Sequence, residues 1–471
     1  MSKLLESPPF LRQSLLLVHI ITYPVLWLGG IRMENVILLS RNTSNSGILT
    51  LHPKLAESMG ITQITARKIR FGAKTYQSIV DISDELPLNG ASLSEDILDM
   101  LNIPQHCSLE IMQNGNEIQI GPFIGLLAGY YQSSIKKYLD HLRDYVLLYH
   151  EIKGAILVFS LDQVDKVNHL VKGYLYNPRT KQWEEGTYPY PSSIFVMTSS
   201  VSTAWIQHFK SIIGNVVFND FFLNRWSIHK KLASSIGVKC YLPDTNLYGS
   251  PQDLYYFLKK FPNLTVKPLN SANRHAYRVL LKDSNSLLIT NLTNMESKNY
   301  RFNNRDQAYS IFSKYFKDGE YIIQESIDVT GYRTITVRFI TVKNHSGQWQ
   351  VMGSFTRGDQ SVKNDGKLMP LVKFEKEIIK DFLQQSDLHA SLTYEELNQI
   401  AIDIVNELEG TGVHLANAAV DITVGELGDI WISEIDHCNP SHDIALVAGD
   451  PDLYYGILKT NMLYGRKLAG F

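Results

Sequence analysis

Cysteine is scarce in this chain, and the few that occur form no pattern. Among 471 residues there are three, Cys107, Cys240 and Cys438, and they are far apart in the sequence. An odd number of cysteines without a C-x-x-C pair indicates neither a disulfide framework nor a cysteine-based zinc site. Because disulfides persist in oxidising compartments, we expect a protein of the reducing cytoplasm.

A surplus of charge of either sign is also missing. The chain carries 45 basic and 47 acidic residues, so it has no basic excess with which to bind nucleic acid. Its 44% hydrophobic and 20% charged residues are typical of a soluble globular protein. With 471 residues the chain is too long for a single core, and several domains are expected.

Familiar catalytic motifs are absent from the sequence as well. It contains no Walker A loop, no G-x-S-x-G and no H-E-x-x-H, so neither a P-loop enzyme, an α/β-hydrolase nor a zinc protease is indicated. His437 and His442 follow an acidic segment and could line a site, but we expect them in a solvated loop.

The N-terminus contains the one strongly apolar run, residues 14–30, which follows Lys3 and Arg12. It resembles a signal sequence or a short anchor, but it is short for a span, Pro24 interrupts it and no small-x-small cleavage site follows. A third interpretation is that Met33 is the natural start and residues 1–32 are an upstream extension. We favour this interpretation and expect no stable membrane insertion.

Residues 33–120 are predicted to form a small β-rich module. Short β-prone runs such as residues 64–71 and 117–120 alternate with turns, and Asn114-Gly115 is typical of a hairpin. A short helix is expected at residues 92–101, which start with serine and have apolar residues at helical spacing.

Residues 121–215 are predicted to form a Rossmann-like α/β domain that begins at Gly121-Pro122. Residues 154–160 and 193–198 are continuous apolar runs, as in strands buried on both faces. Between the start of the domain and the first run, residues 129–151 have an amphipathic, tyrosine-rich pattern that predicts a helix.

From residue 216 to residue 471 the pattern is α+β. Helices are expected at residues 224–236, after Pro251, and at residues 374–384 and 393–409. Strands are expected at residues 264–268, 321–325, 334–343, 349–356, 418–423 and 429–435.

The most informative segment is a predicted hairpin, residues 420–440, VDITVGELGDIWISEIDHCNP. Asp421 lies on its first strand, and Glu434 and Asp436 lie two residues apart on the second, hence on one face. Three carboxylates brought together repel one another unless a cation lies among them, and Mg²⁺ prefers such oxygen ligands. The alternative, an outward polar face of an edge hairpin, stays open at this point.

Other polar residues at strand ends are individually weaker signals. Lys267 closes a strand and could reach phosphate oxygens, and Gln324-Glu325 closes another strand and could hold an adenine and a ribose. Arg338 and Arg357, on two neighbouring predicted strands, could bind phosphate or carboxylate. Taken singly, each also has an ordinary structural explanation as a strand end or surface ion pair.

The order of these residues, rather than any one of them, resembles the ATP-grasp ligases. More closely, the chain resembles the YheC/YheD group of ATP-grasp proteins, described as endospore coat-associated. The resemblance covers most of the chain from Met33 and is carried by these phrases: GPFIGLLAG (121–129), VFNDFFLNRWSIHKKL (217–232), YLPDT (241–245), VKP (266–268), IIQESI (322–327), VRF (337–339) and DIWISEID (429–436).

The resemblance implies that the Rossmann-like domain at residues 121–215 is a pre-ATP-grasp domain and that residues 216–471 form an ATP-grasp domain. It also implies ATP and Mg²⁺ as ligands, with an unidentified carboxylate phosphorylated by ATP and then attacked by an amine or a thiol. Spore coat proteins are implied as partners. The residue roles that follow are Mg²⁺ ligation by Asp421, Glu434 and Asp436, nucleotide binding by Arg225, Lys267, Ser271, Arg274, Gln324, Glu325 and Ile327, and contact with the transferred phosphoryl or acyl group by Arg338 and Arg357.

One segment departs from the family pattern. Where the family has a glycine-rich loop over the phosphates, residues 270–277 read NSANRHAY, without glycine. Glycine lets backbone N–H groups approach phosphate closely. Two interpretations therefore remain: a working ligase that uses side chains such as Arg274 in the loop, or a catalytically degenerate member with a binding or structural role in the spore coat.

Overall fold

The computed structural model describes residues 38–43, 46–199, 201–270, 275–327, 333–357, 372–410 and 412–471. The predictions made for residues 1–32 lie outside this part of the chain. Its strands form four sheets, each with helices packed against it. None of the described helices is both long enough and apolar enough to cross a membrane.

The first sheet contains seven strands in the order β1-β5-β2-β4-β3-β7-β6. The hairpin expected at Asn114-Gly115 is confirmed, since Gly115 has a φ of 60° between β6 and β7. The helix expected at residues 92–101 starts three residues later, because Ser92 and its neighbours pair as a strand with β1. The elements are β1 (Leu38–Asn42), β2 (Ile48–Leu51), α1 (Pro53–Ser58), β3 (Thr65–Phe71), β4 (Lys74–Ile82), β5 (Gly90–Ser94), α2 (Glu95–Leu101), β6 (Glu110–Asn114) and β7 (Glu117–Gly121).

The second sheet has six strands in the order β11-β10-β9-β8-β12-β13. Strands β8, β9, β12 and β13 are parallel neighbours with buried apolar side chains, as predicted. Its elements are β8 (Phe123–Gly129), α3 (Gln132–Ile135), η1 (His141–Val146), α4 (Tyr149–Ile152), β9 (Ala155–Asp165), β10 (Leu170–Asn177), β11 (Gln182–Pro189), β12 (Ser193–Val196), α5 (Thr203–Ile213) and β13 (Val217–Phe218).

The prediction of one helix over residues 129–151 is wrong. The segment is divided into α3, the 3₁₀ helix η1 and the start of α4. One of its buried tyrosines, Tyr149, is held by contacts outside the segment. The Tyr149 hydroxyl accepts from the backbone N–H of Ser108 and donates to the carbonyl of Gly154, at 2.9 and 2.6 Å. Such tertiary contacts outweigh the helical pattern of the local sequence.

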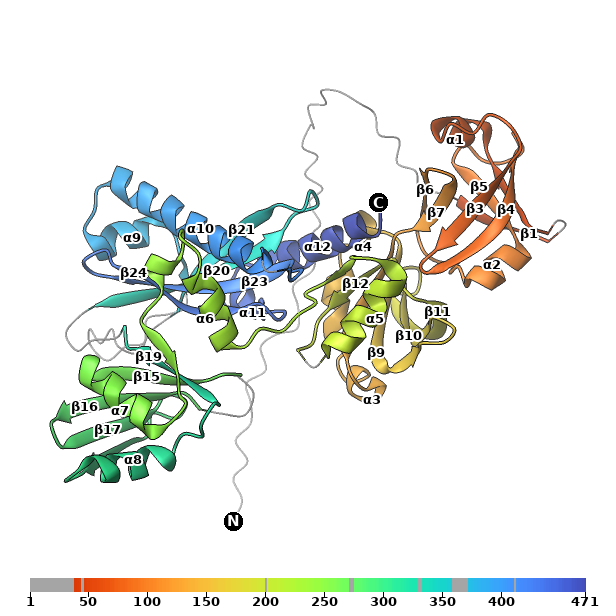
Figure 1. Ribbon diagram of the computed structural model, residues 1–471. Helices are drawn as coiled ribbons and strands as arrows, with labels where there is room; N and C mark the ends of the chain where they lie inside the picture. Colours follow the sequence, from red (N-terminus) through yellow and green to blue (C-terminus); the bar gives the residue numbers. More distant parts are fainter. Residues whose placement is uncertain are drawn as a thin grey trace, which may run out of the picture. The chain divides into compact units, whose positions relative to one another are not determined.

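The third sheet is antiparallel, in the order β14-β19-β15-β16-β17-β18. Helices α7 and α8 lie side by side against one face of it (Figure 1), where they bury Leu264 and Val266 of β15. The alternate residues Thr265 and Lys267 therefore face the other way. The elements are β14 (Thr245–Leu247), α7 (Pro251–Lys260), β15 (Asn263–Pro268), β16 (Tyr277–Asp283), β17 (Ser286–Asn291), β18 (Ser297–Arg301), α8 (Arg305–Ser313) and β19 (Tyr321–Glu325).

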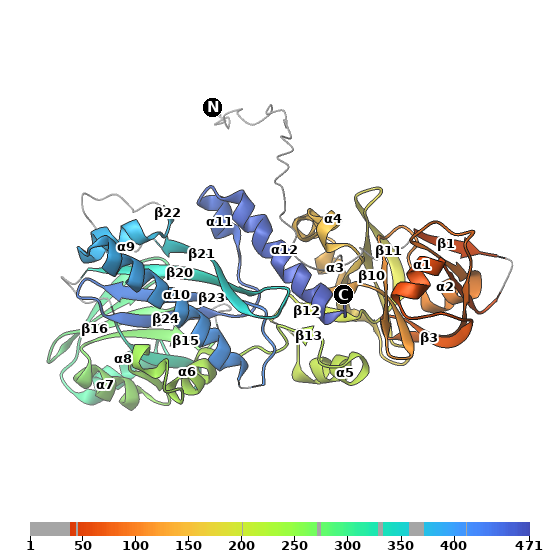
Figure 2. The ribbon, with the colours of Figure 1, turned by 90° about the horizontal axis from the view of Figure 1, so that it is seen from above.

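The fourth sheet, in the order β22-β21-β20-β23-β24, has helices on both faces. Val337 and Phe339 of β20 pack with residues of α10, whereas Ile340 and Val342 pack with residues of α12, on the other side of the sheet in Figure 2. The elements are β20 (Thr334–Lys343), β21 (Trp349–Arg357), β22 (Val372–Lys373), α9 (Lys376–Leu383), α10 (Asp387–Glu409), β23 (Asn417–Gly425), β24 (Ile430–Asp436), α11 (Asp443–Val447) and α12 (Pro451–Leu468).

Two short helices lie between the second and third sheets in the sequence, α6 (Arg225–Ala233) and η2 (Lys239–Tyr241). The side chain of Asn224 caps α6 by accepting from the backbone N–H of Ser227 at 2.8 Å. This cap fixes the first residue of the helix, Arg225, which contributes to the site described next.

Candidate nucleotide and metal site

The strand register of the fourth sheet places Arg338, Asp421 and Glu434 in one row across three strands. Arg338 of β20 is opposite Asp421 of β23, and Asp421 is opposite Glu434 of β24. Asp436 is two residues further along β24, on the same face as Glu434. The predicted hairpin therefore places its three acidic residues on one face of the sheet, and a bulge next to Asp421 leaves Ser433 without an opposite residue.

Asp421 is bound by the arginine beside it. Nε and one terminal nitrogen of Arg338 donate to its two oxygens at 2.7 and 2.9 Å, and the residue is only 1% exposed. Burial opposes the charge of Arg338, but the hydrogen bond to Asp421 and the charges of Asp421, Asp436 and Glu434 outweigh it, so the pKa of the guanidinium is raised. The opposite charges of Asp421 and Arg338 thus neutralise each other inside the protein.

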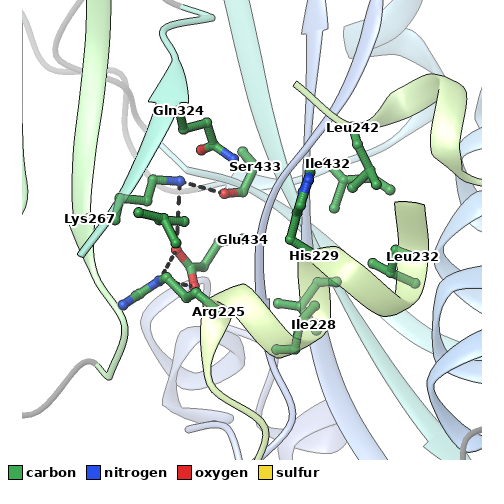
Figure 3. Close-up of a pocket in the computed structure, with 12 residues that line it drawn as sticks. Arg225, Ile228, His229, Leu232, Leu242, Lys267, Gln324, Ile432, Ser433 and Glu434 are labelled. Carbon is green, nitrogen blue, oxygen red and sulfur yellow. Dashed lines mark hydrogen bonds and ion pairs between the residues drawn. The ribbon is translucent and has the colours of Figure 1, made fainter. Parts of the chain in front are cut away.

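Glu434 is bound instead by residues from outside its own sheet. Arg225 donates through Nε to both carboxylate oxygens, at 2.9 and 3.1 Å. Nζ of Lys267, at the end of β15, lies 3.8 Å from Oε2 of Glu434 and donates to the carbonyl of Ser433 at 2.7 Å (Figure 3). Burial lowers the pKa of Lys267, while the nearby charge of Glu434 partly offsets this effect. An ammonium group from one sheet therefore meets the acidic hairpin of another.

Between the third and fourth sheets lies a polar slot of about 150 Å³. Gln324 and Glu325 line it together with Ile327, and Gln324 is fixed by donating to the hydroxyl of Thr245 at 3.1 Å. On the side of the fourth sheet, hydroxyl groups line the slot, and those of Thr336 and Thr423 are 2.9 Å apart. The slot connects the predicted adenine residues with Lys267, which lines it too.

A larger cavity, of about 910 Å³, adjoins the same charged residues. Arg225, Arg338, Glu434 and Asp436 contribute its charges, and burial raises the pKa of Asp436. Its apolar walls come from residues such as Phe222. A cavity of this size can admit a substrate beside the slot.

His437 lines this cavity, and the prediction that His437 and His442 lie in a solvated loop is wrong. Both are 3% exposed, and burial lowers the pKa of each to about 4. Nε2 of His437 accepts from the backbone N–H of Leu223 at 2.9 Å, and its ring stacks on Phe222. Contacts across such long sequence separations leave no signal in the local sequence.

Some predicted site residues fall outside the described part of the chain. Ser271 and Arg274 lie outside it entirely, and so does the side chain of Arg357, whose backbone on β21 is opposite Thr336. Among the described residues, no three histidine, cysteine or acidic side chains converge closely enough to hold a metal ion as they stand. The carboxylates of Asp421 and Glu434 are directed at arginines instead.

Two sheets facing each other across a charged slot, with an acidic hairpin on one and a strand-end lysine on the other, are consistent with an ATP-grasp protein. The model of the YheC/D-like ATP-grasp family matches residues 214–468, more than half of the chain. The chain therefore belongs to the YheC/D-like ATP-grasp family, and the predicted fold class, multidomain α/β and α+β with a C-terminal ATP-grasp fold, is confirmed.

Individual relatives are more distant. The chain is 22% identical over 360 residues to the endospore coat-associated protein YheD of Bacillus subtilis (strain 168), covering 73% of this chain and 78% of that protein. The D-alanine-D-alanine ligase from Coxiella burnetii aligns at 12% identity and a TM-score of 0.38, over 72% of this chain and 94% of the ligase. The ATP-grasp ligase PsnB, solved with a minimal precursor, Mg and ADP, aligns at 10% identity and a TM-score of 0.41, over 72% of this chain and 97% of PsnB.

Proposed function

We propose that this chain binds ATP with Mg²⁺ between its third and fourth sheets. The observation that carries the proposal is the approach of Lys267 to Glu434 across the two sheets, with Nζ 3.8 Å from Oε2. The base and ribose would lie at Gln324, Glu325 and Ile327, which line the slot. The phosphates would meet Lys267 and Arg225, whose charges complement them.

The donor set suits the metal that the family implies. Glu434 and Asp436 share one face of β24, and Mg²⁺ is commonly bound by one or two carboxylates together with phosphate oxygens. Asp421, opposite Glu434 in the register, would complete the set once released from Arg338. When bound, Mg²⁺ would neutralise charge on the phosphate oxygens.

The activity that we propose is an ATP-dependent ligase that joins a carboxylate to an amine or a thiol. The carboxylate would enter the 910 Å³ cavity, where the guanidinium of Arg338 can orient it. Arg338, together with Arg357, would stabilise the negative charge that develops on the transferred phosphoryl and acyl groups. As YheD is endospore coat-associated by its name, we propose a role in sporulation, in the cytoplasm or at the spore coat.

A second candidate function is a catalytically degenerate ATP-grasp protein with a binding or structural role in the spore coat. It is favoured by residues 270–277, which contain no glycine, and by the arginines that already neutralise Asp421 and Glu434. A protein of this kind would bind nucleotide or a coat partner without turnover.

Two measurements on the full chain separate these functions. Thermal unfolding with millimolar Mg·ATP should show a raised melting temperature, because a ligand that binds only the folded state stabilises it. Release of ADP should then depend on a carboxylate and a nucleophile, screened among amino acids, peptides and cell-wall precursors. A thermal shift without ADP in any mixture favours the degenerate function, and no thermal shift rejects nucleotide binding altogether.

A further inference from the structure

Two cations from outside its own sheet lie against Glu434. Nε of Arg225 donates to both of its oxygens, and Nζ of Lys267 is 3.8 Å away. All three side chains are largely buried, with exposed fractions of 19% for Arg225, 17% for Lys267 and 26% for Glu434. A divalent cation arriving at Glu434 would therefore meet two positive charges in a region where water screens them weakly.

Arg225 has further partners that are independent of this carboxylate. A terminal guanidinium nitrogen donates to the carbonyl of Pro268 at 2.7 Å, and the backbone N–H donates to the carbonyl of Leu269 at 3.1 Å. The two acceptors belong to the first and second residues after Lys267 in the sequence. The guanidinium can therefore leave Glu434 while it stays at the end of β15, where its donors match phosphate oxygens.

Building on the proposed function, we propose that Arg225 is an exchangeable counter-ion of Glu434 that couples metal binding to nucleotide binding. Without nucleotide, Arg225 neutralises Glu434 and opposes a free divalent cation. Nucleotide phosphates attract Arg225 and Lys267 away from the carboxylate, and Glu434 becomes available to the metal. By linkage, the metal then raises nucleotide affinity by the same factor by which nucleotide raises metal affinity.

This exchange of counter-ions at Glu434 determines which form of the metal and the nucleotide the site binds. Free Mg²⁺ would bind weakly, whereas the metal–nucleotide complex would supply both the cation for Glu434 and the anion for Arg225. The site would then stay neutralised in both states, with no buried carboxylate left uncompensated.

The test measures Mn²⁺ binding to the full chain by electron paramagnetic resonance, with and without the non-hydrolysable analogue AMP-PNP, after correction for Mn²⁺ bound to free nucleotide. Three proteins are compared: the parent, Arg225→Gln and Lys230→Gln. Lys230 is exposed on the same helix, so its variant has the same change of charge away from the carboxylate. Circular dichroism verifies the fold of each variant.

In the parent and in Lys230→Gln, we expect nucleotide to tighten Mn²⁺ binding by about tenfold or more, within the range of measured couplings. In Arg225→Gln, we expect Mn²⁺ alone to bind about tenfold more tightly than in the parent and the coupling to shrink. Arg225→Lys keeps the positive charge but loses the forked guanidinium group, so its Mn²⁺ affinity and its coupling should lie between those of the parent and of Arg225→Gln. It replaces Arg225→Gln in the test if that variant does not fold.

Equal Mn²⁺ affinity and equal coupling in the parent and both Arg225 variants would overturn the counter-ion exchange, while nucleotide binding would stand. Failure of the parent to bind AMP-PNP with Mn²⁺ at all would reject the proposed function, and the exchange with it.

Discussion

Lys267 and Glu434 belong to different sheets, are 167 positions apart in the chain, and nevertheless lie with Nζ 3.8 Å from Oε2. Lys267 also donates to the carbonyl of Ser433, which has no opposite residue on β23 because of the bulge in β24. The pair places the cation that we propose to bind phosphate beside the carboxylate that we propose to bind Mg²⁺.

Glu434→Gln should weaken nucleotide binding only when metal is present. The change keeps the shape of the side chain but removes the charged metal ligand, so affinity for AMP-PNP with Mg²⁺ should fall by about tenfold or more. With EDTA the variant should bind AMP-PNP at least as tightly as the parent, because the carboxylate no longer competes with phosphate for Arg225 and Lys267. Isothermal titration calorimetry measures both affinities. Glu426→Gln, in the turn of the same hairpin, is the control, and equal affinities of all three proteins with Mg²⁺ would contradict the assignment.

Lys267→Met should lower nucleotide affinity while leaving the unliganded protein intact. Burial already lowers the pKa of this ammonium group, which means that its charge is costly to bury, and methionine removes that cost. Thermal unfolding should show an unchanged or higher melting temperature without ligand and a smaller increase with Mg·ATP. Lys260→Met, an exposed change at the end of α7, should respond to Mg·ATP like the parent. A full ligand response in Lys267→Met would rule out its phosphate contact.

Arg338 and Asp421 should behave as a coupled pair in stability. Removing one partner leaves a buried charge, and Arg338→Met or Asp421→Leu alone should each cost about 3–5 kcal/mol. The double variant leaves neither charge, so its loss should be smaller than the sum of the single losses. Urea denaturation gives the three values, and strict additivity would show that the ion pair contributes nothing.

Stability should fall as the pH drops from about 6.5 to about 4. Burial holds the pKa of His437 and of His442 at about 4 in the folded chain, against 6.5 for a solvated histidine. Within this window the unfolded chain binds more protons, so acidification favours unfolding, by on the order of 3 kcal/mol for each histidine. His437→Gln, which can still accept from Leu223, should flatten the dependence measured by urea denaturation.

The matched control for this pH series is His150→Gln, because His150 lies exposed at α4. A dependence that stays as steep in both His437→Gln and His442→Gln as in His150→Gln would show that other groups govern the acid response.

Much of the fold could be predicted from local patterns. The strand at residues 334–343 and the hairpin around Asp421 and Glu434 depend on neighbouring residues only, and both are confirmed. The prediction of a single helix over residues 129–151 failed because Tyr149 binds partners outside the segment rather than helical neighbours. The strands β16 to β18 were not predicted, although they complete the sheet that contains Lys267.

The residues of the site were easier to predict than their partners. Side chains alternate between the two faces of a strand, so the sequence alone predicts that Glu434 and Asp436 share a face. The pairing of Asp421 with Arg338 depends instead on β20 lying next to β23. The contact between Arg225 and Glu434 depends on how α6 meets another sheet, which no local pattern encodes. His437 was placed in a solvated loop for the same reason, since its partner Leu223 is remote in the sequence.

A structure of the full chain with Mg²⁺ and a non-hydrolysable ATP analogue tests the central claim most directly. The account predicts phosphate oxygens within hydrogen-bonding distance of Nζ of Lys267, Mg²⁺ ligated by Glu434, and the guanidinium of Arg225 turned from Glu434 towards phosphate. A nucleotide bound elsewhere, or bound with Arg225 still paired to Glu434 and no metal at that carboxylate, would contradict it.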